Sequence, residues 1–269
     1  MAKTKVDGSE KTPIKQKSRN ATIEFDELKA FFGEPLVIDL EGVEGVVTVT
    51  QPAMIDIVRI GQARFYATLN VFTTNTTACR LMLWESGIDW NEISDFQLFC
   101  MMTSGIDPEV SAMLFGDLDF SKFEMFTKQK DDAEEIVLYN KEQQIEIDER
   151  VYQHFCQYLR TVFNINPEEK ITNDKTMKQW FINKDKRERA NAAFKQEKES
   201  SIVPIISACI NHPGFKYNLE ELKNVKVYQF YDAVRRLQIY EQSTALLKGM
   251  YSGFVDSSHI DPDAYNFMK

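Results

Sequence analysis

Apolar residues repeat at helical spacing over one long segment near the C-terminal end of the chain. The members of this stripe are Val227, Phe230, Val234, Leu237, Thr244, Leu247 and Tyr251, widened by Tyr231 and Tyr240. This periodicity predicts an amphipathic helix that uses its apolar face for packing. Asn224 is the expected N-cap, and Gly249 and Gly253 mark the expected end of the helix.

Two pairs of short apolar runs predict β-hairpins. Residues 36–40 and 46–49 are rich in β-branched side chains and are joined by a segment with glycines, and residues 136–139 and 145–147 flank a polar turn. Such runs, separated by turn residues, are typical of antiparallel strand pairs. We predict an extended or irregular conformation for residues 119–125.

Cap residues and helical periodicity predict a series of helices around these hairpins. Pro52 opens a helix with Gly61 as a weak point in its interior. Ser94, Asp107 and Asp148 are the expected N-caps of three further helices. We therefore predict an α+β, mostly α-helical fold, a helical bundle with two small β-hairpins.

The pattern also predicts how the chain divides. Residues 1–20 indicate a disordered basic tail, and residues 21–116 an N-terminal domain with a β-hairpin and packed helices. Residues 117–254 indicate a mainly helical C-terminal domain with the second hairpin, and residues 255–269 a C-terminal tail. A helix from about residue 172 towards Glu199 is charged in its second half, as in a solvent-exposed spacer or a face that awaits a partner.

Charge is distributed unevenly over the 269 residues, whose net charge is −9. Residues 1–20 hold six basic and two acidic side chains, which leaves −13 for the remainder. An acidic body is unsuited to wrapping nucleic acid, because phosphate neutralisation dominates that affinity. We expect residues 1–20 to be solvated, and an arm that contacts an acidic partner or nucleic acid is the alternative.

The four cysteines lie far apart in apolar sequence, at Cys79, Cys100, Cys156 and Cys209. Their placement is typical of reduced, core-filling thiols in an intracellular protein. No apolar run approaches the ~20 residues of a membrane span, and no secretory h-region is found near the N-terminus. We therefore expect a soluble, intracellular protein with no membrane partner.

Catalytic and metal-binding patterns are missing from the sequence. His154, His212 and His259 form no paired ligand spacing, and Cys209 with His212 is at most a two-ligand fragment. There is no phosphate-binding glycine loop and no nucleophile elbow, and the paired carboxylates lie in polar segments typical of solvated faces. We predict no enzymatic activity, no cofactor and no metal.

Apolar side chains after the last predicted helix are the candidate partner-binding residues. They are Phe254, Tyr265, Phe267 and Met268. Apolar residues in a terminal segment dock either on the body of their own chain or on another chain.

Three segments carry a resemblance to a known class of proteins. They are VTQPAMIDIVRIGQARFYATLNVFT (49–73), LMLWESGIDWNEISDFQLF (81–99) and INHPGFKYNLEELKNVKVYQFYDAVRRLQIYEQSTALLKGMYSGFVD (210–256). Over most of residues 25–260 the chain resembles tailed-phage morphogenesis proteins of the tail assembly chaperone or baseplate hub chaperone type. The shared motifs are packing patterns, so the resemblance assigns no functional residue.

This resemblance implies a non-enzymatic protein of the host cell cytoplasm or the virion. We predict that it binds a tail protein such as the tape measure or a baseplate hub component, as a chaperone or a minor structural component. The alternative is a nucleic-acid-associated accessory protein that uses residues 1–20 and the basic cluster 184–189. A third hypothesis is an enzyme whose site is assembled from His154, His212 and Cys209.

Overall fold

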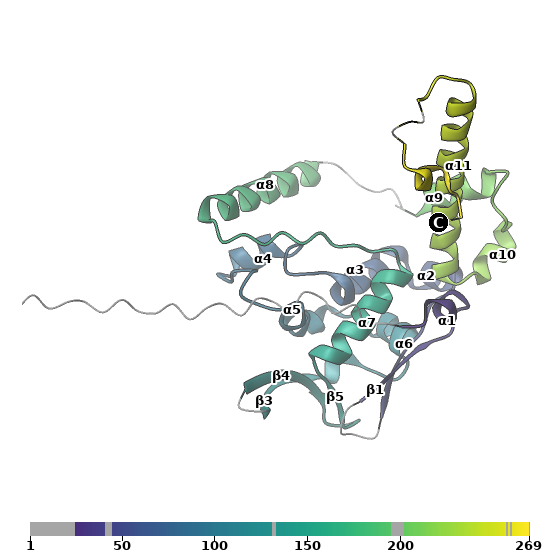
Figure 1. The fold of residues 1–269 in the computed structure, drawn as a ribbon. Coiled ribbons are helices and arrows are strands. Elements are labelled where there is room, and N and C mark those ends of the chain that lie inside the picture. The colour runs from purple at the N-terminus through teal and green to yellow at the C-terminus, as the bar shows by residue number, and fades with distance from the viewer. Residues whose placement is uncertain are drawn as a thin grey trace, which may run out of the picture.

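Helices and two small antiparallel sheets make up the computed structural model, which describes residues 25–40, 45–130, 133–194, 202–256, 258 and 260–268 (Figure 1). The α-helices are α1 Glu27–Phe31, α2 Met54–Ile60, α3 Gln62–Thr73, α4 Arg80–Glu85, α5 Asp95–Met102, α6 Pro108–Phe115, α7 Glu149–Val162, α8 Lys175–Phe194, α9 Val203–Asn211, α10 Leu219–Asn224 and α11 Val227–Tyr251. The strands are β1 Leu36–Asp39, β2 Val46–Val49, β3 Glu124–Lys130, β4 Ala133–Asn140 and β5 Ile145–Ile147. Short 3-10 helices are η1 Thr103–Gly105, η2 Phe120–Lys122 and η4 Pro262–Tyr265. The predicted α+β, mostly α-helical class is confirmed.

Cap side chains begin several helices where the sequence predicts them. The Ser94 hydroxyl accepts a hydrogen bond from the Gln97 backbone N–H (3.2 Å), and the Gln97 side chain accepts one from the Ser94 N–H (2.8 Å). Asp107 and Asp148 likewise accept backbone N–H groups at the first turns of α6 and α7. Each cap satisfies N–H groups that a helix end leaves unpaired.

Two predicted helix boundaries are wrong. The helix expected after Pro52 is divided into α2 and α3 at Gly61, whose φ is +98°. Glycine adopts that backbone conformation readily, so the residue turns the chain instead of weakening a continuous helix. Asn224 is the last residue of α10, and the N-cap of α11 is Lys226.

The two sheets lie where hairpins are predicted, but the second is larger than expected. β1 pairs with β2, and β4 pairs with β5. β3 adds a third strand by pairing with β4 along its whole length. The sequence gives little sign of β3, because the adjacent residues Met125 and Phe126 are both exposed and no buried face repeats along it.

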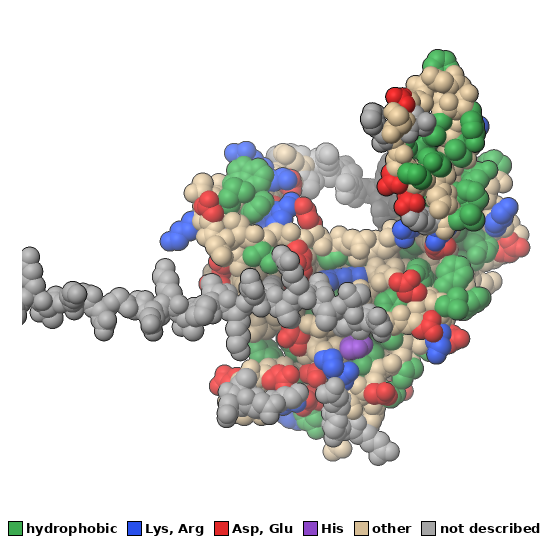
Figure 2. Space-filling model, viewed as in Figure 1, with side chains coloured by type: hydrophobic (Ala, Val, Ile, Leu, Met, Phe, Trp, Pro, Cys, Tyr) green, Lys and Arg blue, Asp and Glu red, His purple; other side chains and the backbone are tan. Residues whose placement is uncertain are grey.

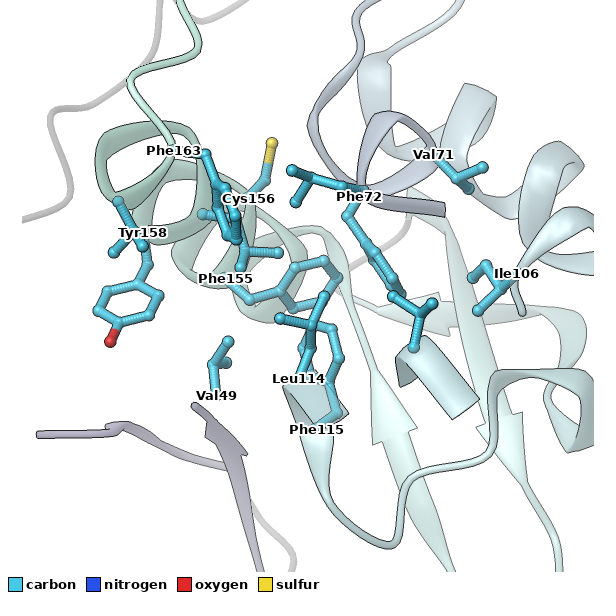
Figure 3. Close-up of a cluster of buried hydrophobic side chains, with 14 of the residues drawn as sticks. Val49, Val71, Phe72, Ile106, Leu114, Phe115, Phe155, Cys156, Tyr158 and Phe163 are labelled. Carbon is cyan, nitrogen blue, oxygen red and sulfur yellow. The ribbon is translucent and has the colours of Figure 1, made fainter. Parts of the chain in front are cut away.

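One continuous hydrophobic core joins the first sheet, the central helices and the base of α11. Phe72 lies within it, near Phe115 and Phe155 (Figure 3). Its ring centre is 4.9 to 6.1 Å from those of Phe99, Phe115, Phe120 and Phe155. Aromatic rings at these separations add pair interactions to the burial of their area. This core includes residues on both sides of residue 116, where the sequence predicts a domain boundary. The division into two domains stays a prediction.

α8 packs against α4 over a second, smaller core. Its buried side chains are Leu83, Trp90, Leu98 and Ile182. Arg80 of α4 donates two hydrogen bonds to Asp185 of α8, at 2.6 and 2.5 Å, and both side chains are largely buried. Lys178 forms a further ion pair with Asp89. Directed ion pairs therefore add to the few apolar contacts of α8, whose second half has little apolar stripe.

No helix among the described residues is long and apolar enough to cross a membrane.

Candidate partner-binding surface

α11 is anchored to the body through its first turns. Val227 and Phe230 are buried in the main core. The Val227 N–H donates a hydrogen bond to the Pro52 carbonyl at 3.1 Å. Tyr231 shares a hydrogen bond of 2.8 Å with Tyr66 of α3, and burial raises the pKa of both phenols. Core contacts and hydrogen bonds together fix where the helix leaves the body.

Beyond this base, α11 extends away from the body (Figure 1). Ser243 is the one buried residue of the helix after Phe230. Leu237 is half-buried, whereas Tyr240 and Tyr251 are exposed. The predicted apolar face is therefore a packing surface at the base and only partly covered farther out. We call the described residues of 237–268 the C-terminal arm.

The chain reverses after α11 and returns along it, so that η4 lies beside the helix (Figure 1). Gly253 has a φ of +74°, which suits the reversal. The N–H groups of Phe254 and Val255 donate hydrogen bonds to the Gly249 carbonyl at 3.0 and 3.1 Å. These contacts dock the tail on its own helix while leaving part of it exposed.

Gly249 makes room for this return of the chain. A Cβ atom at residue 249 would lie 2.7 Å from Cγ2 of Val255, closer than carbon atoms pack. The sequence suggests Gly249 only as a sign that the helix frays, but the helix continues to Tyr251. The glycine instead allows Val255 to pack directly on the helix backbone.

The four predicted partner-binding residues have different surroundings. Phe254 is 90% exposed and Met268 77% exposed. Phe267 is 49% exposed, and its ring packs edge-on against Tyr240 at 5.7 Å between centres. Tyr265 is half-buried. The structure thus divides the set into the strongly exposed Phe254 and Met268, the half-buried Tyr265, and Phe267, which packs on α11.

Tyr251 belongs to the same exposed surface, although the sequence assigns it to the packing stripe. It is 86% exposed on the last turn of α11, three residues before Phe254. Hydrophobic side chains gather along the arm in the space-filling view (Figure 2). Periodicity cannot identify such a residue, because it reports one face of a helix and not how far the body covers that face.

The residues considered for catalysis have ordinary structural surroundings. Cys209 is buried, and burial raises the pKa of its thiol. His212 lies at the end of α9, where its Nε2 is 3.3 Å from a carboxylate oxygen of Glu241 on α11. His154 lies on α7, with Nδ1 2.8 Å from the Arg150 carbonyl, and His259 lies outside the described residues.

The other cysteines are less acidic than usual too. Burial raises the pKa of the Cys79 and Cys156 thiols, and that of Cys100 to about 12. A raised pKa keeps a thiol protonated and a poor nucleophile. Within the described part of the chain, no group of three or more His, Cys, Asp and Glu side chains is arranged to hold a metal ion.

The basic cluster 184–189 shares its charges with acidic neighbours. Arg189 pairs with Glu85 at 2.7 Å, and Lys184 lies 3.7 Å from Glu188. Asp185 within the cluster binds Arg80. The cluster therefore helps to attach α8, while residues 1–20, on which the nucleic-acid hypothesis also depends, lie outside the described residues.

The C-terminal arm lies in the part of the chain that resembles a known family. Residues 195–269 match a family model described as the YomV second domain. This family is derived from phage, from a Bacillus prophage. The match includes α9, α10, α11 and the whole arm. No curated protein and no solved structure matches the chain.

Proposed function

We propose that this is a non-enzymatic phage protein that binds another tail protein through its C-terminal arm. The observation that carries the proposal is the exposure of Tyr251, Phe254 and Met268, at 86%, 90% and 77%. Large apolar side chains gain free energy when a partner removes them from water. Three of them on one projecting segment favour an interaction site over a scatter of surface residues.

Two further observations support a phage assembly role. The arm lies within the segment that matches a phage-derived domain family. Residues 49–73, 81–99 and 210–256 resemble tail assembly and baseplate hub chaperones. A tape measure protein or a baseplate hub component is therefore the proposed partner, and the role is that of a chaperone or a minor structural component.

The chemistry of the arm predicts what the partner offers. Aromatic and methionine side chains are enriched in the cores of protein interfaces, and a few of them carry most of the binding energy. Tyr251 and Phe254 are close in sequence at the tip, so one apolar groove can take both. We expect the partner to supply such a groove, with the polar residues around the tip at its rim.

Co-expression with neighbouring tail proteins and pull-down tests this proposal. The variant is Tyr251→Ser with Phe254→Ser, which removes the exposed aromatic surface without touching the core. The matched control is Phe32→Ser, at the residue that follows α1, because Phe32 is also exposed, at 68%, and lies outside the arm. Retention of a tail protein by the wild type and by the control, but not by the arm variant, is the expected result.

Two outcomes would count against this proposal. If no tail protein is retained by the wild type, the function itself fails. If the arm variant retains the partner as well as the control does, binding occurs elsewhere on the molecule. Mass spectrometry of purified particles then distinguishes the two roles, because a structural component is present in the particle and an assembly chaperone is not.

A further inference from the structure

The three-stranded sheet has a long strand at its edge. β3 pairs with β4 on one side, and no other described strand pairs with its opposite side. β5 pairs only with residues 138–140 of β4, so the β3–β4 hairpin reaches beyond the rest of the sheet (Figure 1). An edge of this kind offers a row of backbone N–H and C=O groups to which another strand can add.

The side chains of this edge are suited to contact with protein. Glu124, Phe126 and Lys128 lie on one face of the strand, because residues two apart share a face. Phe126 is 39% exposed, and Met125 on the opposite face is 58% exposed. Lys141 lies 5.3 Å from the centre of the Phe126 ring. Glu124 pairs with Lys141 at 2.8 Å, and Lys128 pairs with Glu146 of β5. The edge thus presents an exposed aromatic ring with a carboxylate two residues before it and an ammonium group two residues after it, each of them also in an ion pair within its own chain.

The order of these charges makes the strand complementary to itself. When two copies of β3 run antiparallel about Phe126, Glu124 of each copy lies opposite Lys128 of the other. The two Phe126 rings then face each other, and Met125 lies opposite Thr127. Opposite charges and aromatic residues placed directly across a strand pair are stabilising, and like charges are destabilising.

We propose that two copies of this chain associate through β3, antiparallel and with Phe126 opposite Phe126. The two sheets then form one continuous sheet across the dimer. β3 and the C-terminal arm lie at opposite ends of the molecule in Figure 1, so both arms stay accessible. The dimer presents two partner-binding arms, and its formation does not depend on the function proposed for them.

Charge reversal in the full-length chain tests the pairing. Sedimentation over a concentration series should show a dimer for the wild type. Lys128→Glu and Glu124→Lys each place like charges opposite one another twice, so each should weaken dimerisation about tenfold or more. Each reversal also places a like charge beside Lys141 or Glu146 within the chain. The double variant Glu124→Lys with Lys128→Glu keeps both of these changes but restores opposite charges across the strand pair, so it should restore the dimer.

Cysteine cross-linking tests the register. Residues opposite each other in an antiparallel pair have Cα separations that a disulfide can span. Phe126→Cys should therefore yield a disulfide-linked dimer on mild oxidation. The control Gln129→Cys should not, because the two copies of residue 129 would lie about 20 Å apart at ~3.3 Å per residue.

The results that overturn the proposal are distinct. A wild type that stays monomeric at every concentration removes it. A dimer whose dissociation constant is unchanged by the single charge reversals also contradicts the proposal. So does a double variant that has the melting temperature of the wild type but stays monomeric. Equal cross-linking at residues 126 and 129 would rule out the register.

Discussion

Two segments pack on this molecule by different chemistry, and the difference bears on what each can do. α8 is attached by the largely buried Arg80–Asp185 pair with α4, by the Lys178–Asp89 pair with the segment after α4, and by Ile182 in the smaller core. The C-terminal tail is attached to α11 by two backbone hydrogen bonds to the Gly249 carbonyl and by apolar contacts of Val255 with Gly249 and of Phe267 with Tyr240. The first attachment fixes one geometry, whereas the second covers only part of an apolar surface.

The two attachments respond differently to loss of a contact. A buried charge needs its own partner, because an unpaired charge in a poorly hydrated site is costly. An apolar contact is less directional, so a different apolar surface can replace it. α8 is therefore held in one position, while the arm keeps apolar side chains exposed to solvent.

The largest effect is expected from breaking the α8 attachment. Arg80→Met leaves Asp185 buried without its partner and should lower the free energy of unfolding by about 3 kcal/mol. Urea denaturation of the full chain measures this. The double variant Arg80→Met with Asp185→Leu should regain most of the loss, because it leaves no unpaired charge. A single variant as stable as the wild type would show that the pair does not hold α8.

A smaller effect is expected at the base of α11. Tyr66→Phe removes one hydroxyl and leaves that of Tyr231 half-buried without this partner, which should cost about 1–2 kcal/mol of unfolding free energy. Adding Tyr231→Phe removes the second hydroxyl and should recover part of the loss. Thermal denaturation of the three chains provides the measurement. If the double variant were the least stable, the cost would come from packing and not from an unsatisfied hydroxyl.

A local effect is expected in the arm. Gly249→Ala places a Cβ atom against Val255 and should release the tail at a cost of about 1 kcal/mol, partly offset by the higher helix propensity of alanine. Hydrogen exchange should then rise in residues 254–268 but not in the first turns of α11. Adding Val255→Ala removes the clashing Cγ2 and should restore protection. Unchanged exchange in Gly249→Ala would show that the tail is not held at this point.

The smallest effect is expected from the exposed end of the α8 attachment. Arg189→Gln removes the pair with Glu85, whose members are both well exposed, and exposed pairs contribute little to stability. The melting temperature should stay near that of the wild type. A loss comparable to that of Arg80→Met would remove the distinction between buried and exposed ion pairs on this helix.

Local signals predicted much of this fold because they act over a few residues. Ser94, Asp107 and Asp148 cap helices through their own side chains, and the paired strands β1 and β2 coincide with two short runs rich in β-branched residues. β3 was missed because pairing with β4, not an apolar pattern, defines it. Gly61 is predicted as a weak point inside one helix, whereas its φ of +98° separates α2 from α3.

The candidate site was predicted less completely than the fold. Phe254 and Met268 are exposed as a partner-binding role requires, and Tyr265 is half-buried. Tyr251 was assigned to packing because its spacing matches the buried residues at the helix base. The exposure of residues along α11 depends on how far the other elements cover the helix. The whole fold determines that coverage, and the apolar periodicity of the helix does not.

The length of α11 determines how a force at its tip reaches the body of the molecule. Its 25 residues span about 37 Å at ~1.5 Å per residue, from the core at Val227 to the tip at Tyr251. Because the helix is stiff and is fixed at its base, a small sideways force at its tip produces a torque at the base. A load at the tip therefore acts on the contacts that fix the first turns of α11, among them the hydrogen bond between Tyr66 and Tyr231 and the buried side chains of Val227 and Phe230.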